Sequence, residues 1–187
     1  MVEILVVIAV VSIVGVIITT IFIRSLRGSN KAQIISQIKQ NGQIVLENMD
    51  ETIRNADHLV CVSNNPDNTL VVEKAGLYTR FRIDPQGTTN GSIQQDNPIP
   101  TAVESDPKLF IDRVCNPQDP MPPEGSLTDT GLQSGIKVMS GSFTRNRQAG
   151  FKDAVRINFI FGPGVGAPKA VAGQINPVTF ETTVQLR

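Results

Sequence analysis

MVEILVVIAVVSIVGVIITTIFI, residues 1–23, is the stretch that decides the architecture of this chain, because one charge, Glu3, interrupts its apolar run. About 20 apolar residues in a helix span the hydrocarbon core of a bilayer, so the stretch is long enough to cross a membrane with some tilt. No basic region precedes it, and Ile21-Phe22-Ile23-Arg24 is not the small-residue cleavage site of a secretory signal peptide. The sequence therefore predicts a membrane-spanning helix over residues 1–23.

Glu3 requires a physical explanation, because a carboxylate in or near hydrocarbon is costly. In one interpretation it pairs with an N-terminal amine, its own or that of an identical neighbouring chain, since this amine is positive near neutral pH. Between staggered helices such a pair would fix the axial register, as a lone buried polar group does in coiled coils. In the other interpretation, Glu3 lies at headgroup depth and reaches water. The energetics leave both open.

Residues 1–11, Met-Val-Glu-Ile-Leu-Val-Val-Ile-Ala-Val-Val, resemble the N-terminal helix of type IV pilins and type II secretion pseudopilins. The resemblance covers residues 1–23 closely and the continuation over residues 24–57 in general form. It implies a structural subunit, above all a major pilin, that leaves the bacterial inner membrane and polymerises into a helical surface filament. It also implies a basic leader removed by a prepilin peptidase, N-methylation of the new terminus, pilus assembly machinery, and pairing of Glu3 with the terminal amine of a neighbour's Met1.

Two features depart from the pattern of this family. The acid is third, whereas processed chains usually carry it fifth, so either a Phe-Thr pair precedes Met1 or Met1 is a real terminus with another cleavage register. The membrane segment also lacks the Pro at which many pilin helices melt in the filament. Gly15, Thr19 and Thr20 are the available weak points, because Gly and β-branched residues are poorer helix formers. A continuous helix is the alternative.

Charge and cysteine content narrow the class further. The chain has 17 basic and 17 acidic residues and is only 5% aromatic, which argues against a specific nucleic-acid site. An exported domain would join Cys61 to Cys115 in a disulfide, worth about 4 kcal/mol in the chain-entropy model. Topology leaves a conflict: Arg24, Arg27 and Lys31 would hold their end in the cytoplasm by the positive-inside rule, whereas removal of a basic leader reverses that bias.

Residues 24–57 continue the helix with an apolar face, which we expect to pack on the chain's own β-sheet. Gly28-Ser29-Asn30 is a possible bend or interruption, because Gly and Asn disfavour helix interiors. The face consists of small and apolar residues spaced by three or four, as on one side of an α-helix: Ile35, Ile38, Gly42, Val45, Met49, Ile53 and Ala56.

Residues 58–187 are predicted to form a globular β-sheet domain with long loops at residues 84–106 and 115–135. Alternation in residues 70–83 predicts a hairpin whose second strand turns Arg80 and Arg82 to water. Further strands are expected at residues 59–63, 108–114, 136–143, 154–161 and 178–187. The predicted fold class is α+β: a long N-terminal helix, half membrane-spanning and half amphipathic, packed on an antiparallel sheet, as in pilins.

Catalytic and ligand-binding patterns are missing from the sequence, so we expect no enzyme, cofactor or metal site. His58 is the single histidine, which leaves a catalytic triad without independent support. Asn90-Gly91-Ser92 matches a glycosylation acceptor, a weak motif because it is short.

The leading hypothesis is thus a homo-oligomeric filament subunit, and the sequence leaves open whether the filament serves twitching motility, cell adhesion, DNA uptake or secretion. A pseudopilin or minor pilin of a secretion or DNA-uptake machine, and a monomeric membrane-anchored binding protein, are the alternatives.

Overall fold

A computed structural model describes residues 2–62, 67–86, 88–101, 106–122, 125–132 and 135–187. The fold is α+β, with a long N-terminal helix and antiparallel sheets, as the sequence predicts. The elements in chain order are α1 (Val2–Arg54), β1 (His58–Cys61), β2 (Thr69–Lys74), β3 (Leu77–Asp84), β4 (Ser92–Asp96), α2 (Pro107–Val114), β5 (Ile136–Asn146), β6 (Ala154–Pro163), α3 (Lys169–Ala172) and β7 (Val178–Gln185).

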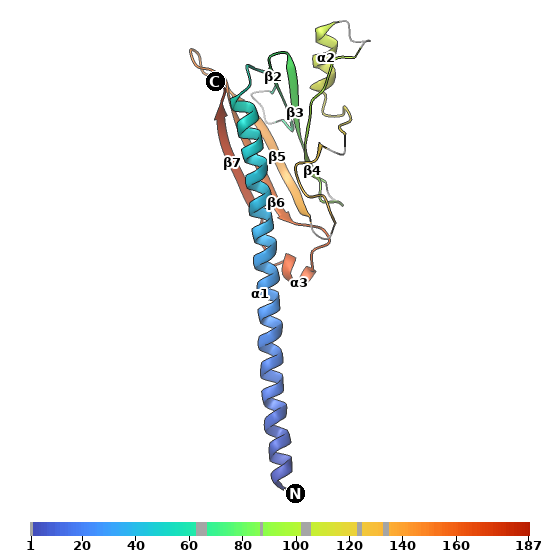
Figure 1. Ribbon diagram of the computed structural model, residues 1–187, viewed down its shortest axis with the longest axis vertical. Coiled ribbons are helices and arrows are strands. Elements are labelled where there is room, and N and C mark those ends of the chain that lie inside the picture. The colour runs from blue at the N-terminus through green and yellow to red at the C-terminus, as the bar shows by residue number, and fades with distance from the viewer. Residues whose placement is uncertain (1, 63–66, 87, 102–105, 123–124, 133–134) are drawn as a thin grey trace.

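Helix α1 runs without a break for 53 residues, and its N-terminal half projects from the folded domain (Figure 1). The possible interruption at Gly28-Ser29-Asn30 does not occur. A glycine in a helix interior costs about 1 kcal/mol relative to alanine, whereas breaking the helix would forfeit backbone hydrogen bonds and require a second nucleation. The chain's two ends consequently lie at opposite ends of the molecule in Figure 1.

The C-terminal half of α1 packs across β6 and β7 with the apolar face that the spacing predicts. Gly42 lies under the ring of Phe180, where an added Cβ atom would be 2.1 Å from the ring's Cζ. Phe180 in turn stacks on Phe159, with ring centroids 5.3 Å apart. The helix approaches the sheet this closely because Gly42 has no side chain. The residues that α1 buries are Ile38, Gly42, Val45, Met49 and Ile53.

The described strands form two antiparallel sheets, one in the order β1-β2-β3-β4 and one in the order β5-β6-β7. Asp67 and Phe143 join them through two backbone hydrogen bonds, with N–O distances of 2.9 and 2.6 Å. In β6, every second residue from Val155 to Phe161 is fully buried, as the alternation predicts. Phe81 and Ile83 of β3 enter the same core, so the two sheets stabilise each other.

Two sequence predictions about the middle of the chain are wrong. Residues 108–114 belong to a helix, α2, and not to a strand. The Asp106 side chain caps α2 by accepting a hydrogen bond from the backbone N–H of Lys108 at 2.9 Å, and Pro107 takes the first turn, where its missing N–H costs nothing. The predicted loop 84–106 contains β4, in which Ile93 pairs with Ile83 of β3. The remaining residues of β4 are polar, which hides its strand character in the sequence.

Candidate functional site

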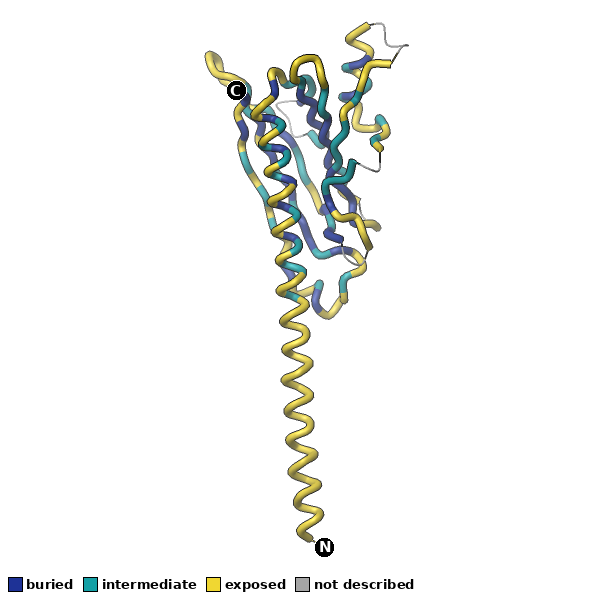
Figure 2. The backbone as a smooth tube through the Cα atoms, viewed as in Figure 1, coloured by how far each residue is buried: buried dark blue, intermediate teal, exposed yellow. Residues whose placement is uncertain are grey.

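The exposed apolar half of α1 is the candidate functional site. Every residue from 2 to 30 is exposed, as Figure 2 shows by the unbroken yellow of the projecting helix. The most apolar 18-residue window has a mean hydropathy of 3.1, and none of it is buried. This helix is long and apolar enough to cross a membrane, which indicates membrane association. A soluble monomer rarely exposes an apolar patch larger than a few hundred Å², so the segment needs a partner outside the folded domain.

The hydroxyl groups of residues 2–23 are satisfied inside the helix. Ser12, Thr19 and Thr20 each donate a hydrogen bond of 2.8 Å to the backbone carbonyl four residues earlier. Bonds of this kind hide polar side chains from apolar surroundings. Gly15 has open space around its Cα, and the predicted weak points Gly15, Thr19 and Thr20 are helical in the isolated chain. Their melting in a filament stays a prediction.

Glu3 is the one charged residue between Val2 and Ile23, and it lies in the first turn of α1. A carboxylate there is favoured by the partial positive charge of the helix N-terminus. Among the described residues, none forms an ion pair with Glu3. Met1, its predicted partner, lies outside the described residues.

A second candidate region lies at the far end of the domain, where Cys61 of β1 and Cys115 at the end of α2 form the predicted disulfide, with a Cα–Cα distance of 5.6 Å. Around it, α2 closes a small second core with β2 and β3. The ring of Phe110 meets that of Tyr78 edge-on, with the centroids 4.8 Å apart. The disulfide therefore ties α2 to the four-stranded sheet.

Arg80 and Arg82 of β3, predicted to face water, are instead buried, with 1% and 6% of their surface exposed. Arg80 donates to both carboxylate oxygens of Asp96 and forms an ion pair with Asp119. Arg82 donates to the carbonyl oxygens of Asn116, at 2.8 Å, and of Asp119. The prediction fails because the segment following the disulfide folds back over this face of the sheet.

The electrostatics of the two arginines differ. Burial by itself would lower the pKa of Arg80, but hydrogen bonds and charge from Asp96 and Asp119 outweigh it and raise that pKa above its usual value. Burial and the neighbouring charge of Arg80 lower the pKa of Arg82 from its usual value. Arg80 is therefore held by paired charge, and Arg82 by backbone carbonyls. Both arginines hold residues 116–120 against the sheet, and we call the two together the arginine clamp.

Asn90, the weak glycosylation candidate of the sequence, is buried, and its modification stays a prediction. Its side-chain nitrogen donates to the carbonyl oxygen of Gly131 at 2.6 Å, and its side-chain oxygen accepts from the backbone N–H of Val165 at 2.8 Å. A glycan on that nitrogen would have to displace the two loops that it joins. Asn90 therefore has a structural role.

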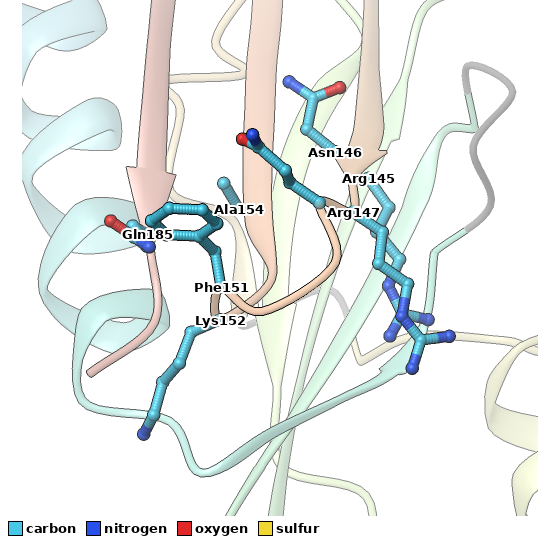
Figure 3. Close-up of a pocket in the computed structure, with 8 residues that line it drawn as sticks. Arg145, Asn146, Arg147, Phe151, Lys152, Ala154 and Gln185 are labelled. Atoms are coloured by element: carbon cyan, nitrogen blue, oxygen red, sulfur yellow. The ribbon is translucent and has the colours of Figure 1, made fainter.

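The hairpin between β5 and β6 lines an open hollow of about 730 Å³, drawn in Figure 3. Arg145 is paired with Asp153, and the Lys152 ammonium donates to the carbonyl oxygen of Arg187. Phe151 is 66% exposed at the hairpin tip. Because Arg145 and Lys152 are already paired within the domain, we do not assign this hollow as a ligand site. In the described part of the chain, no group of His, Cys, Asp or Glu side chains could hold a metal ion.

Comparison with protein-family models, curated proteins and solved structures finds no match to this chain. The projecting apolar helix with its single acid is therefore the feature on which a functional proposal rests. Sequence reasoning located this helix and the disulfide, but it missed the arginine clamp and the buried asparagine.

Proposed function

We propose that this chain is a pilin-class structural subunit, which residues 2–23 hold in the membrane and which assembles into a helical filament by bundling these helices. The observation that carries the proposal is the unbroken α1, whose residues 2–30 are exposed over their whole length. Lipid covers this surface before assembly, and identical helices cover it afterwards. In both surroundings the apolar side chains are removed from water, at about 25 cal/mol per Å² buried.

Glu3 supplies the selectivity of this assembly. With the hydroxyls of Ser12, Thr19 and Thr20 bonded inside the helix, Glu3 is the polar side chain of residues 2–23 that has no partner among the described residues. The terminal amine of a neighbouring copy provides an opposite charge, and in a low-dielectric helix bundle this pair disfavours registers that leave the carboxylate alone. The pair therefore sets the axial position of each new subunit.

The folded domain forms the outer surface of the filament in this proposal. It lies at the opposite end of α1 from Glu3, and its disulfide fits an oxidising compartment outside the cytoplasm. The clamp on residues 116–120 holds the surface segment after Cys115 to the sheet. Export of the domain follows if a basic leader precedes the apolar segment, as the resemblance to pilins implies.

Electron microscopy of filaments sheared from the native cells, with mass spectrometry of the subunit, tests this function. We expect long filaments built mainly from this chain, with a methylated terminus and oxidised cysteines. A chain that is only a trace component of such filaments would favour a minor pilin. A chain that stays in the membrane fraction, with free thiols and without filaments, would overturn the proposal and favour a monomeric anchored binding protein.

Reversal of charge tests the role of Glu3 within this function. We expect Glu3→Lys to abolish filaments while the chain remains in the membrane, because the terminal amine would then face a like charge. Asp112→Lys, on the exposed side of α2, is the matched control and should leave filaments unchanged. Normal filaments from Glu3→Lys would exclude the pairing mechanism.

A further inference from the structure

Three basic residues and two acids of α1 lie in separate groups along the helix, with the exposed Lys39 between the groups. Arg24, Arg27 and Lys31 form a group that we call the basic stripe, and Glu47 and Glu51 form a second group about six turns further on. The described residues make no ion pair with any of the five. Asp50, by contrast, is paired with Arg54 within the same helix. Both groups are therefore available to an external partner.

The basic stripe lies on the side of α1 that carries the domain. Arg24 and Lys31 precede the buried residues Ile38 and Val45 by successive steps of seven, which return to nearly the same side of an α-helix. Lys31 is half-buried at the base of the domain, whereas Arg24 and Arg27 lie beyond it and are exposed. These side chains therefore point outward from the helix, in the direction of the domain.

The acidic pair lies on the opposite side. Glu47 follows buried Val45 by two residues, and Glu51 follows buried Met49 by two, a rotation of about 200° in each case. Ile44 is 53% exposed and precedes Glu47 by three residues, so it belongs to the same side. We call Ile44, Glu47 and Glu51 the acidic face.

We propose that the acidic face of one copy binds the basic stripe of a second copy of this chain, displaced along the helix by about 20 residues, or about 30 Å. The inference rests on the proposed function and deepens it, since it names a contact between subunits. Consider parallel copies that pack with their domains on the outside of the filament, the upper copy being displaced toward the C-terminal end of α1. The basic stripe of the upper copy then faces away from the filament axis, and the acidic face of the lower copy faces toward it. At this displacement the two surfaces meet.

The contact is heterologous, because its two surfaces lie on opposite faces of the same helix. Each copy therefore carries both surfaces, and the contact can repeat from copy to copy without closing, as a filament requires. Without displacement, parallel copies would place basic residues beside basic residues and acids beside acids. Charge complementarity of this kind chiefly selects the correct partner arrangement. The stripe and the acidic face would thus add a second constraint on register to that of Glu3.

Crosslinking in native filaments tests the displacement directly. Both natural cysteines are in the disulfide, so thiols introduced by Arg27→Cys and Glu47→Cys would be free to react. Within one chain, 20 residues of helix separate these positions by about 30 Å, too far for a disulfide. We expect oxidation to give a ladder of covalent multimers. Arg27→Cys with Gln40→Cys, also exposed but 13 residues apart, is the matched control and should give little ladder.

A ladder from the control pair in place of the Glu47 pair would overturn the inference and leave the filament proposal intact. Absence of filaments from the unmodified chain would instead refute the proposed function itself. The two failures are thus distinguishable.

A charge exchange separates this contact from binding of the stripe to lipid phosphates. We expect the combined change Glu47→Lys and Glu51→Lys to lower filament yield at least about tenfold. Adding Arg24→Glu, Arg27→Glu and Lys31→Glu should restore most of it. Unchanged filaments after reversal of the acids alone would overturn the inference and leave lipid headgroups as the remaining partner for the stripe.

Discussion

The two halves of α1 share one unbroken backbone but differ in every other respect. Residues 2–30 are exposed, whereas the half from Lys31 to Arg54 buries one face against β6 and β7. Hydrogen bonds four residues apart keep both halves helical, since they need no tertiary partner. Side-chain packing, by contrast, belongs to the second half alone. Continuity of a helix therefore does not require continuity of its surroundings, and the unpacked half is the part that the proposed assembly would bury.

Introducing a charge should give the largest difference in unfolding free energy between the two halves. Met49→Lys places an uncompensated ammonium where α1 meets the sheet, and we expect a loss of about 5 kcal/mol or more, enough to unfold a typical domain. Val14→Lys, in the exposed half, should change the unfolding free energy of the domain by less than about 0.5 kcal/mol. Denaturant titration of the full chain in detergent, followed by the fluorescence of Tyr78, the single tyrosine, measures both. Equal losses would show that the halves are energetically coupled.

Removal of the cation from an ion pair should likewise cost more unfolding free energy in buried than in exposed surroundings. Arg80→Met removes the cation between two nearly buried carboxylates, Asp96 and Asp119, and should cost about 3–5 kcal/mol. Arg156→Met removes one member of an exposed pair with Glu181 and should cost about 0–1 kcal/mol. The same titration compares them. A small loss for Arg80→Met would mean that the clamp on residues 116–120 contributes little to folding.

The smallest effect on stability is expected when the same change, glycine to alanine, is made in each half of α1. Gly42→Ala must displace the ring of Phe180 and should destabilise the domain by about 1–3 kcal/mol, despite the better helix propensity of alanine. Gly28→Ala meets open space and should favour the helix by up to about 1 kcal/mol without affecting the domain. Thermal unfolding followed by circular dichroism measures the two variants. A stabilised Gly42→Ala variant would show that the helix can move away from β7.

Individual elements show how far the sequence could predict this fold. The face of α1 and the buried side of β6 follow from helical and strand periodicity, which local residues fix. Helix α2 was predictable as well: Asp106 followed by Pro107 is a helix-start signal, although the apolar run of residues 109–111 also fits a strand. The burial of Arg80, Arg82 and Asn90 had no such local signal, because it depends on segments distant in the chain.

The sequence by itself determined the long helix, the division of that helix into an apolar and an amphipathic half, the isolation of Glu3 and the availability of two cysteines. Each is a property of residue type and spacing along a single stretch. Only the tertiary structure decided that both sides of β3 are buried, how Asn90 joins two loops, and which segments cover the face of Arg80 and Arg82. The reason is physical: periodicity sets which residues share a face, but the segments that pack onto a face are chosen by the whole chain.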